Sequence, residues 1–254
     1  MLEIHLFSCL SDNYGVLVRE PASGLVATID APEARAVEAA LAEKRWTLTH
    51  ILTTHHHHDH TDGNLALKAA HGCTIIGPRD EAARVPGIDT TVGDGDVFQF
   101  GAEEVRVIGT PGHTAGHISY WMPASKVAFV GDTLFVLGCG RVIEGSMQMM
   151  WESLTKLAAL PRDTRVYCGH EYTVSNAKFA LTIEPDNAAL AARAEEAQRL
   201  RASGLPTVPT EIGLELDTNP FLRPQVASIR TRLGMTAAAD WQVFGEIRER
   251  KNRG

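Results

Sequence analysis

The segment Thr54-His55-His56-His57-His58-Asp59-His60 brings an H-x-H-x-D-H arrangement of potential metal ligands into seven residues. If the extended character of the preceding apolar residues continues into it, the period-two alternation of a strand places His55 and His57 on one side, where both can bind one ion. Asp59 and His60 follow in a turn that leads toward a helix, so they can point at a second ion nearby. His56 and His58 are expected to face away.

A run of four histidines can also be a purification tag or a loose metal-binding tract without fixed geometry. This run lies inside the chain, between a β-like segment and the amphipathic segment 64–70, whereas a tag normally sits at a terminus. The histidine run favours a metal site but does not decide between these interpretations by itself; the later segments do.

Three later segments supply further ligands, and each contains glycine and follows a β-like run, where side chains can project from the end of a strand. They are Thr110-Pro111-Gly112-His113, Gly131-Asp132-Thr133 and Cys168-Gly169-His170. Imidazole and carboxylate groups are ligands that zinc and similar divalent ions accept.

The ligands divide into two sets of three and one shared carboxylate. One set is His55, His57 and His113, the other is Asp59, His60 and His170, and Asp132 can bridge both ions. A structural zinc site would instead close four ligands, usually including cysteines, around one ion. The pattern therefore favours two adjacent ions with an open position for water, and a metal-dependent hydrolase.

The motifs T-H-x-H-x-D-H, T-P-G-H-T-x-G-H, G-D-T-L-F and C-G-H-E-Y-T occur here in that order. With them, the chain resembles the metallo-β-lactamase superfamily and, within it, the hydroxyacylglutathione hydrolases, also called glyoxalase II. The first three motifs are shared across the superfamily, whereas Gly138-Cys139-Gly140-Arg141, residues 168–173 and Asn219-Pro220-Phe221-Leu222-Arg223 are more specific to the hydrolases.

The resemblance implies an α+β fold with two domains. Residues 1–172 would form an αββα sandwich that binds metal and carries out catalysis, and residues 173–254 a small helical domain that binds glutathione. The sequence itself shows only a change to Ala-, Glu- and Arg-rich composition after about Ser175.

The resemblance also implies the reaction. S-(2-hydroxyacyl)glutathione, in particular S-D-lactoylglutathione, would be hydrolysed to glutathione and D-lactate, the second step of methylglyoxal detoxification. Two divalent ions can hold a hydroxide at neutral pH and polarise the thioester carbonyl, with Asp59 and Asp132 as the catalytic carboxylates. Zn²⁺ is the expected ion, and iron or manganese would also accept these ligands.

Four residues are expected to bind the glutathione part of the substrate. Arg248 and Lys251 are three positions apart, so on a helix they share a face that could hold a carboxylate. A solvated basic helix end is the simpler interpretation of this tail. The resemblance favours binding of the glycine carboxylate of glutathione by these two residues, and contact with its backbone by Arg141 and Tyr172.

Charge and cysteine content limit the other classes of function. A net charge of −7 makes nucleic acid a poor partner. No segment is apolar enough for a membrane span or a signal peptide. The four cysteines are scattered without a C-x-x-C pair, so reduced thiols and a cytoplasmic location are expected. Cys168 is expected to be a small buried residue, and the protein is expected to be a monomer.

Two other activities stay open. A persulfide dioxygenase of the same superfamily would use one iron held by two histidines and an aspartate, and a lactonase or β-lactamase could share the metal centre. The complete second set and the basic tail argue against the dioxygenase, and residues 168–173 argue against the lactonase. A metal-binding module without activity is the third and weakest alternative.

Overall fold

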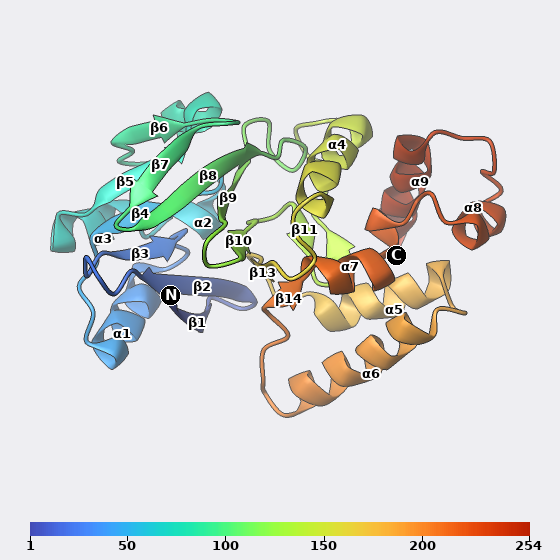
Figure 1. Ribbon diagram of the computed structural model, residues 1–254, viewed down its shortest axis with the longest axis horizontal. Coiled ribbons are helices and arrows are strands. Elements are labelled where there is room, and N and C mark those ends of the chain that lie inside the picture. Colours follow the sequence, from blue (N-terminus) through green and yellow to red (C-terminus); the bar gives the residue numbers. More distant parts are fainter. The chain divides into compact units, whose positions relative to one another are not determined.

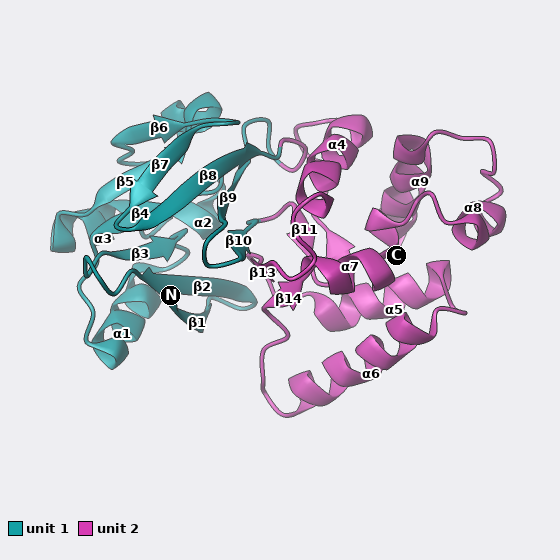
Figure 2. Cartoon of the chain, viewed as in Figure 1, with its two compact units in different colours: residues 1–110, 114–131 teal, residues 111–113, 132–254 magenta.

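The computed structural model describes all 254 residues, and the chain divides into two compact units (Figure 2). Unit 1 contains residues 1–110 and 114–131, and unit 2 contains residues 111–113 and 132–254.

Unit 1 contains two β-sheets (Figure 1). The strands of the first sheet follow chain order, β1 to β6, and those of the second have the order β10-β9-β8-β7. In the first sheet, β1 to β3 pair antiparallel and β3 to β6 pair parallel, whereas the second is antiparallel throughout. The strands are β1 (Glu3–Cys9), β2 (Asn13–Arg19), β3 (Val26–Ile29), β4 (His50–Leu52), β5 (Thr74–Pro78), β6 (Thr90–Val92), β7 (Val97–Phe100), β8 (Glu103–Gly109), β9 (Ile118–Met122) and β10 (Val127–Phe129).

The core of unit 1 forms where helices cover the first sheet. Helix α1 (Ala34–Lys44) buries Val37, Ala40 and Leu41, and α3 (Asn64–His71) buries Leu67. These side chains join Leu17, Ile51 and Ile75 of the sheet in one apolar cluster. Helix α1 packs against the antiparallel strands β1 and β2, and α3 packs against the parallel strand β5.

Tyr120 links the two sheets of unit 1. Its side chain is fully buried on β9, and its hydroxyl donates a hydrogen bond of 2.7 Å to the carbonyl of Thr53, directly after β4. Burial raises the pKa of the Tyr120 hydroxyl, so it remains a donor. The bond holds the end of β4, where the histidine segment begins.

The amphipathic segment 64–70 forms helix α3, as its pattern indicates, and a separate short helix precedes it. A short helix α2 (His58–Thr61) ends at Asp62, and α3 begins at Asn64. Between them, the backbone of Gly63 donates to the carbonyl of Ala31, and a Cβ there would lie 2.9 Å from that oxygen. Glycine is needed for this close approach, which anchors the end of α2.

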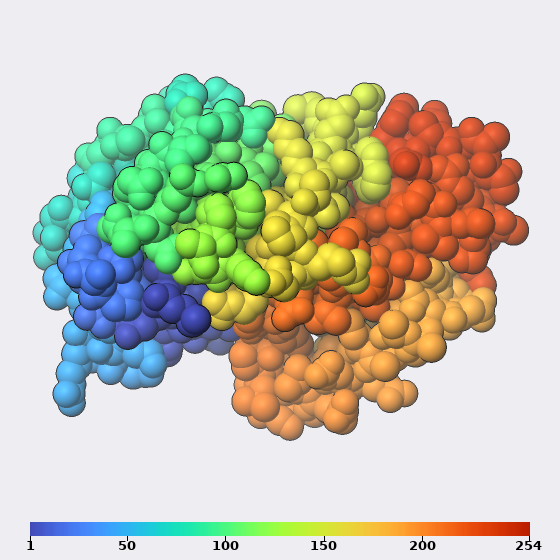
Figure 3. All heavy atoms as spheres, in the orientation of Figure 1, coloured from blue at the N-terminus to red at the C-terminus, as the bar shows by residue number.

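Unit 2 contains short strand pairs and six α-helices (Figure 1). Within the Ala-, Glu- and Arg-rich sequence that follows Ser175, helix α6 begins after Asn187, whose side chain accepts a hydrogen bond from the Leu190 amide at 3.1 Å. Figure 3 shows α6, in orange, at the surface. The elements are β11 (Leu134–Phe135), β12 (Gly138–Cys139), α4 (Met147–Ala158), β13 (Arg165–Tyr167), α5 (Thr173–Ile183), α6 (Ala188–Ala202), β14 (Thr210–Glu211), α7 (Ile212–Thr218), α8 (Ala227–Leu233) and α9 (Asp240–Arg253), with a 3₁₀ turn at Pro220–Leu222; a further 3₁₀ turn, Arg79–Arg84, lies in unit 1.

Glu215 on α7 is the centre of a buried polar network in unit 2. Its side chain is fully buried and accepts hydrogen bonds from the Leu137 amide at 2.9 Å, Arg193 at 2.8 Å, Thr210 at 2.7 Å and Asn219 at 2.9 Å. One carboxylate thus joins α6, α7 and the β11–β12 hairpin.

The predicted α+β class is confirmed by the two sheets of unit 1 and the helices that follow. No helix in the chain has the length and apolar character needed to cross a membrane.

Candidate metal centre

His55 and His57 lie after the end of β4, in a segment without regular secondary structure. His55 Nε2 and His57 Nδ1 are 3.1 Å apart, and the other nitrogen of His55 lies 3.0 Å from the Thr54 hydroxyl. Two imidazole nitrogens this close to one another can both direct a lone pair at one ion. The side chains therefore have the arrangement that the alternation predicted, although the strand itself stops at Leu52.

Asp59 and His60 are carried by α2, which directs them to the same region of unit 1. His60 Nε2 lies 3.7 Å from Asp59 Oδ2, and His60 Nδ1 lies 2.8 Å from Asp30 Oδ2. A carboxylate on one imidazole nitrogen fixes the ring and leaves the other nitrogen directed toward a metal. Asp30, at the end of β3, is a residue that the sequence analysis did not identify.

Unit 2 contributes His113, Asp132 and His170. Asp132 Oδ2 lies 3.4 Å from His113 Nε2 and 3.3 Å from His170 Nε2, and all three side chains are buried. His113 Nδ1 lies 2.9 Å from the carbonyl oxygen of Arg141. Because a carbonyl only accepts, Nδ1 carries the proton, and Nε2 is the nitrogen suited to a metal.

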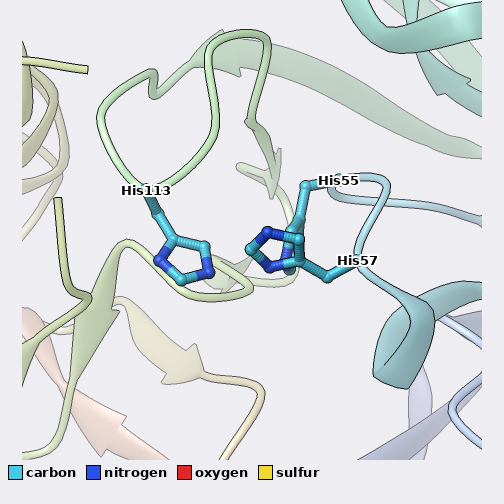
Figure 4. Close-up of side chains that lie close together, drawn as sticks. All are labelled: His55, His57 and His113. Carbon is cyan, nitrogen blue, oxygen red and sulfur yellow. The ribbon is translucent and has the colours of Figure 1, made fainter. Parts of the chain in front are cut away.

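Four groups of possible ligand atoms each lie within 4.8 Å of one another, and two of them are the predicted sets His55, His57 and His113, and Asp59, His60 and His170. The other two are Asp30, His55 and His60, and His56, Glu81 and Glu144. Figure 4 shows the imidazole rings of the first group facing one another. Ligand atoms about 2.0 to 2.1 Å from an ion in a tetrahedron lie about 3.3 to 3.4 Å apart. The 3.1, 3.3 and 3.4 Å separations given above match this spacing, so nitrogen and oxygen donors here fit divalent metal ions.

His56 and His58 point away from this cluster, as the alternation predicted. The side chain of His58 is 96% exposed. His56 Nδ1 lies 2.7 Å from the buried carboxylate of Glu81, which also accepts from the backbone amides of His56 at 2.9 Å and Gly116 at 2.7 Å. Glu81 therefore ties the histidine segment to the glycine-rich turn that precedes β9.

Cys168 is buried, as predicted, and burial raises the pKa of its thiol to about 12. Its Sγ donates to the carbonyl of His170 at 3.5 Å. A thiol that stays protonated at neutral pH is a poor nucleophile and a poor ligand, so Cys168 supports the backbone near His170.

Tyr172 and Arg141 both lie beside ligands in unit 2. The ring of Tyr172 stacks on the imidazole of His170, with centroids 4.8 Å apart and an angle of 4° between the planes. Arg141 follows β12 with an exposed side chain, while its carbonyl holds His113 as described above. Both positions are compatible with the predicted contact to substrate, which stays a prediction.

Arg248 and Lys251 lie one turn apart on α9. Arg248 is only 3% exposed, donates to the Cys139 carbonyl at 2.9 Å and lies over the ring of Phe221. Lys251 lies over the ring of Phe179, and burial, with a smaller effect of the Arg248 charge, lowers the pKa of its amine to about 8. Arg248 thus has a structural role beside its predicted one, and Lys251 is the more accessible of the two cations.

Asp30, Glu81 and Asn13 are the residues around the cluster that the sequence analysis missed. Asp30 follows the apolar run Val26–Ile29, which is the same signal that identified Asp132 after β10. Asn13 and Glu81 carry no comparable signal, because their contacts span 46 and 25 residues of sequence.

Comparison with known proteins identifies two family models that together match most of the chain. Residues 24–170 match the metallo-beta-lactamase superfamily, and residues 171–254 match the hydroxyacylglutathione hydrolase C-terminus. The superfamily match and the histidine and aspartate clusters show that the chain binds divalent metal ions.

Similar proteins cover the whole chain. Hydroxyacylglutathione hydrolase from Brucella anthropi is 60% identical over 251 residues, which are 99% of this chain and 96% of the relative. Among solved structures, ETHE1 from Myxococcus xanthus has a TM-score of 0.70 at 27% identity, over 98% of this chain and 91% of that one. A metallo-beta-lactamase from Staphylococcus aureus, with a TM-score of 0.67 at 19% identity over 98% of this chain and 71% of that one, shares the fold. The chain therefore belongs to the hydroxyacylglutathione hydrolase family of the metallo-β-lactamase superfamily.

Proposed function

We propose that this protein hydrolyses S-(2-hydroxyacyl)glutathione, in particular S-D-lactoylglutathione, to glutathione and D-lactate. The observation that carries the proposal is the 60% identity to hydroxyacylglutathione hydrolases along nearly the full length of both chains. The match of residues 171–254 to the C-terminal model of the same hydrolases supports the glutathione part of the substrate.

We infer two functional domains, a metal-binding catalytic domain of residues 1–172 and a glutathione-binding helical domain of residues 173–254. The change from one family model to the other at residues 170 and 171 supports this division. In the proposal, the first domain carries the seven metal ligands together with Arg141 and Tyr172, and the second carries Arg248 and Lys251.

The seven ligands are proposed to hold two ions, one on His55, His57 and His113 and the other on Asp59, His60 and His170, with Asp132 shared between them. When bound, divalent ions would lower the pKa of water toward neutrality and polarise a thioester carbonyl. Nitrogen and carboxylate donors without thiolate favour Zn²⁺, and iron and manganese accept the same set.

The carboxylates have separate tasks in this proposal. Asp132 Oδ2 lies 3.4 Å from His113 Nε2 and 3.3 Å from His170 Nε2, which supports the proposal that Asp132 would be a ligand shared by both ions. The carboxylate of Asp59, whose side chain is 42% exposed, is proposed to accept a proton from the attacking water.

The leaving group needs no acid from the protein. A thiol has an ordinary pKa of about 8.5, so the thiolate of glutathione departs without obligatory protonation. The buried Cys168, whose pKa is raised to about 12, takes no part in this step.

Further inferences concern location and assembly. All four cysteines are buried and unpaired, which fits a reducing compartment such as the cytoplasm. No helix exposes more than one large apolar side chain, which supports a monomer without a protein or membrane partner.

The proposed reaction is tested by following the loss of thioester absorbance with metal-loaded protein. S-D-lactoylglutathione should be consumed with release of one free thiol per molecule, while an acyl thioester that lacks glutathione should react slowly. Consumption of oxygen with glutathione persulfide, without thioester hydrolysis, would instead establish the mono-iron dioxygenase alternative, and lactone opening alone would establish a lactonase.

The lowered pKa of Lys251 predicts a pH dependence of KM. The ammonium form attracts a substrate carboxylate, and this form is lost as the pH rises through the pKa of about 8. The protonated fraction of Lys251 falls about tenfold between pH 7 and pH 9, so KM should rise by at most about tenfold over this range, while kcat changes less. Steady-state kinetics across this range measure the effect.

The control is Lys251→Arg, which keeps its charge throughout and should flatten the KM profile. A parent KM that stays constant up to pH 9, or a Lys251→Arg profile with the same slope as the parent, would remove Lys251 from carboxylate binding.

A further inference from the structure

Asn13, the first residue of β2, makes two hydrogen bonds to one metal ligand. Its side chain is buried, and Nδ2 donates to the backbone oxygen of Asp59 at 3.0 Å and to Asp59 Oδ2 at 3.1 Å. A backbone carbonyl oxygen and an ionised carboxylate oxygen only accept hydrogen bonds, so the amide nitrogen of Asn13, and not its oxygen, faces them. The amide nitrogen thus makes both of these hydrogen bonds to a single residue.

These two bonds restrict the side chain of Asp59. One bond holds the backbone oxygen of Asp59 and the other holds its carboxylate oxygen, both against the same amide of Asn13. Together they fix the rotation of the Asp59 side chain about its Cα–Cβ bond. Without them, a carboxylate that is 42% exposed on the four-residue helix α2 could rotate toward water. The direction of the carboxylate therefore depends on Asn13.

The β1–β2 hairpin determines where Asn13 lies. Cys9 pairs with Asn13 at the end of the hairpin, and Leu10 has a φ of 48°, which lets the chain turn within three residues. Backbone hydrogen bonds between β1 and β2 hold this end of the hairpin in register. Asn13 is thus presented to α2 by a rigid element rather than by a mobile loop.

We propose that Asn13 is a positioning residue, which orients the Asp59 carboxylate as a ligand and raises the affinity of the ion held by Asp59, His60 and His170. This inference rests on the binuclear centre of the proposed function. Partners that orient metal ligands typically change metal affinity by about 10- to 100-fold when removed.

The test compares Asn13→Ala and Asn13→Gln with the matched control Asn64→Ala. Asn64 is also fully buried in unit 1, but its amide donates to the carbonyl of Pro86, at 3.2 Å, and not to a metal ligand. Zn²⁺ affinities are measured by competition with a chromophoric chelator, and the thermal unfolding of each metal-free variant is recorded beside them.

For Asn13→Ala, we expect the affinity of one of two Zn²⁺ ions to fall by about 10- to 100-fold while the other is unchanged, and Asn13→Gln to restore part of the loss. Asn64→Ala should lower the unfolding temperature of the metal-free protein and leave both affinities as in the parent. Co²⁺-loaded Asn13→Ala should also show altered d–d absorption.

Two results would overturn the inference, and they differ in what else they affect. In the first, the parent binds two ions and Asn13→Ala binds both as tightly as the parent, or loses no more affinity than the control Asn64→Ala does. Asn13 would then have a structural role alone. If the parent itself binds a single ion, the binuclear centre fails and the role of Asn13 fails with it.

Discussion

Replacing Asp132 by alanine is expected to reduce kcat for S-D-lactoylglutathione by at least about 100-fold, the scale on which enzymes lose a group that stabilises the transition state. Asp132 Oδ2 lies 3.4 Å from His113 Nε2 and 3.3 Å from His170 Nε2, so its removal takes away a donor beside both sets of ligands. Metal content should fall together with turnover, as measured by elemental analysis of the same sample.

His58→Ala is the control for this change. His58 lies within the histidine segment, but its side chain is 96% exposed and points away from the ligands. Turnover and metal content of His58→Ala should equal those of the parent. An Asp132→Ala protein with the parent kcat would remove Asp132 as a shared ligand.

Glu215→Ala is expected to lower the free energy of unfolding by about 3 to 5 kcal/mol, the usual cost of removing one partner of a buried ion pair. The side chain of Arg193 is only 14% exposed and would lose its counter-charge at 2.8 Å. The Leu137 amide would also lose its acceptor at 2.9 Å. Denaturant unfolding of the metal-free protein measures this change.

Asp217→Ala provides the comparison on the same helix, α7. Asp217 pairs with Arg162 at 2.6 Å, but the two side chains are 54% and 61% exposed, so the expected loss is below about 1 kcal/mol. Equal losses in the two variants would show that the buried network of Glu215 contributes no more to stability than a surface pair.

The ligand segment could be predicted from sequence because its information is local. The alternation of residues 55–58 separates two ligands from His56 and His58, and the separation survives even though β4 ends at Leu52. The glycine-containing strand ends likewise indicated Asp132 and His170, whose side chains lie 3.3 Å apart in the structure; their role as metal ligands stays a prediction.

The residues that support the ligands could not be predicted in the same way. Asn13 reaches Asp59 across 46 residues, and Glu81 reaches His56 across 25, so only the folded sheet brings each pair together. Nothing in the sequence around Glu215 distinguishes this buried carboxylate from the exposed Asp217 two positions later. Burial is a property of the assembled helices, and composition does not reveal it.

Stepwise addition of Zn²⁺ to the metal-free protein, with the initial rate of S-D-lactoylglutathione hydrolysis measured at each step, tests the binuclear hydrolase most directly. The predicted result is a rate that stops rising at two ions per chain, a number that the two ligand groups and the shared Asp132 imply. Full activity with a single ion, or no hydrolysis with two ions bound, would contradict it.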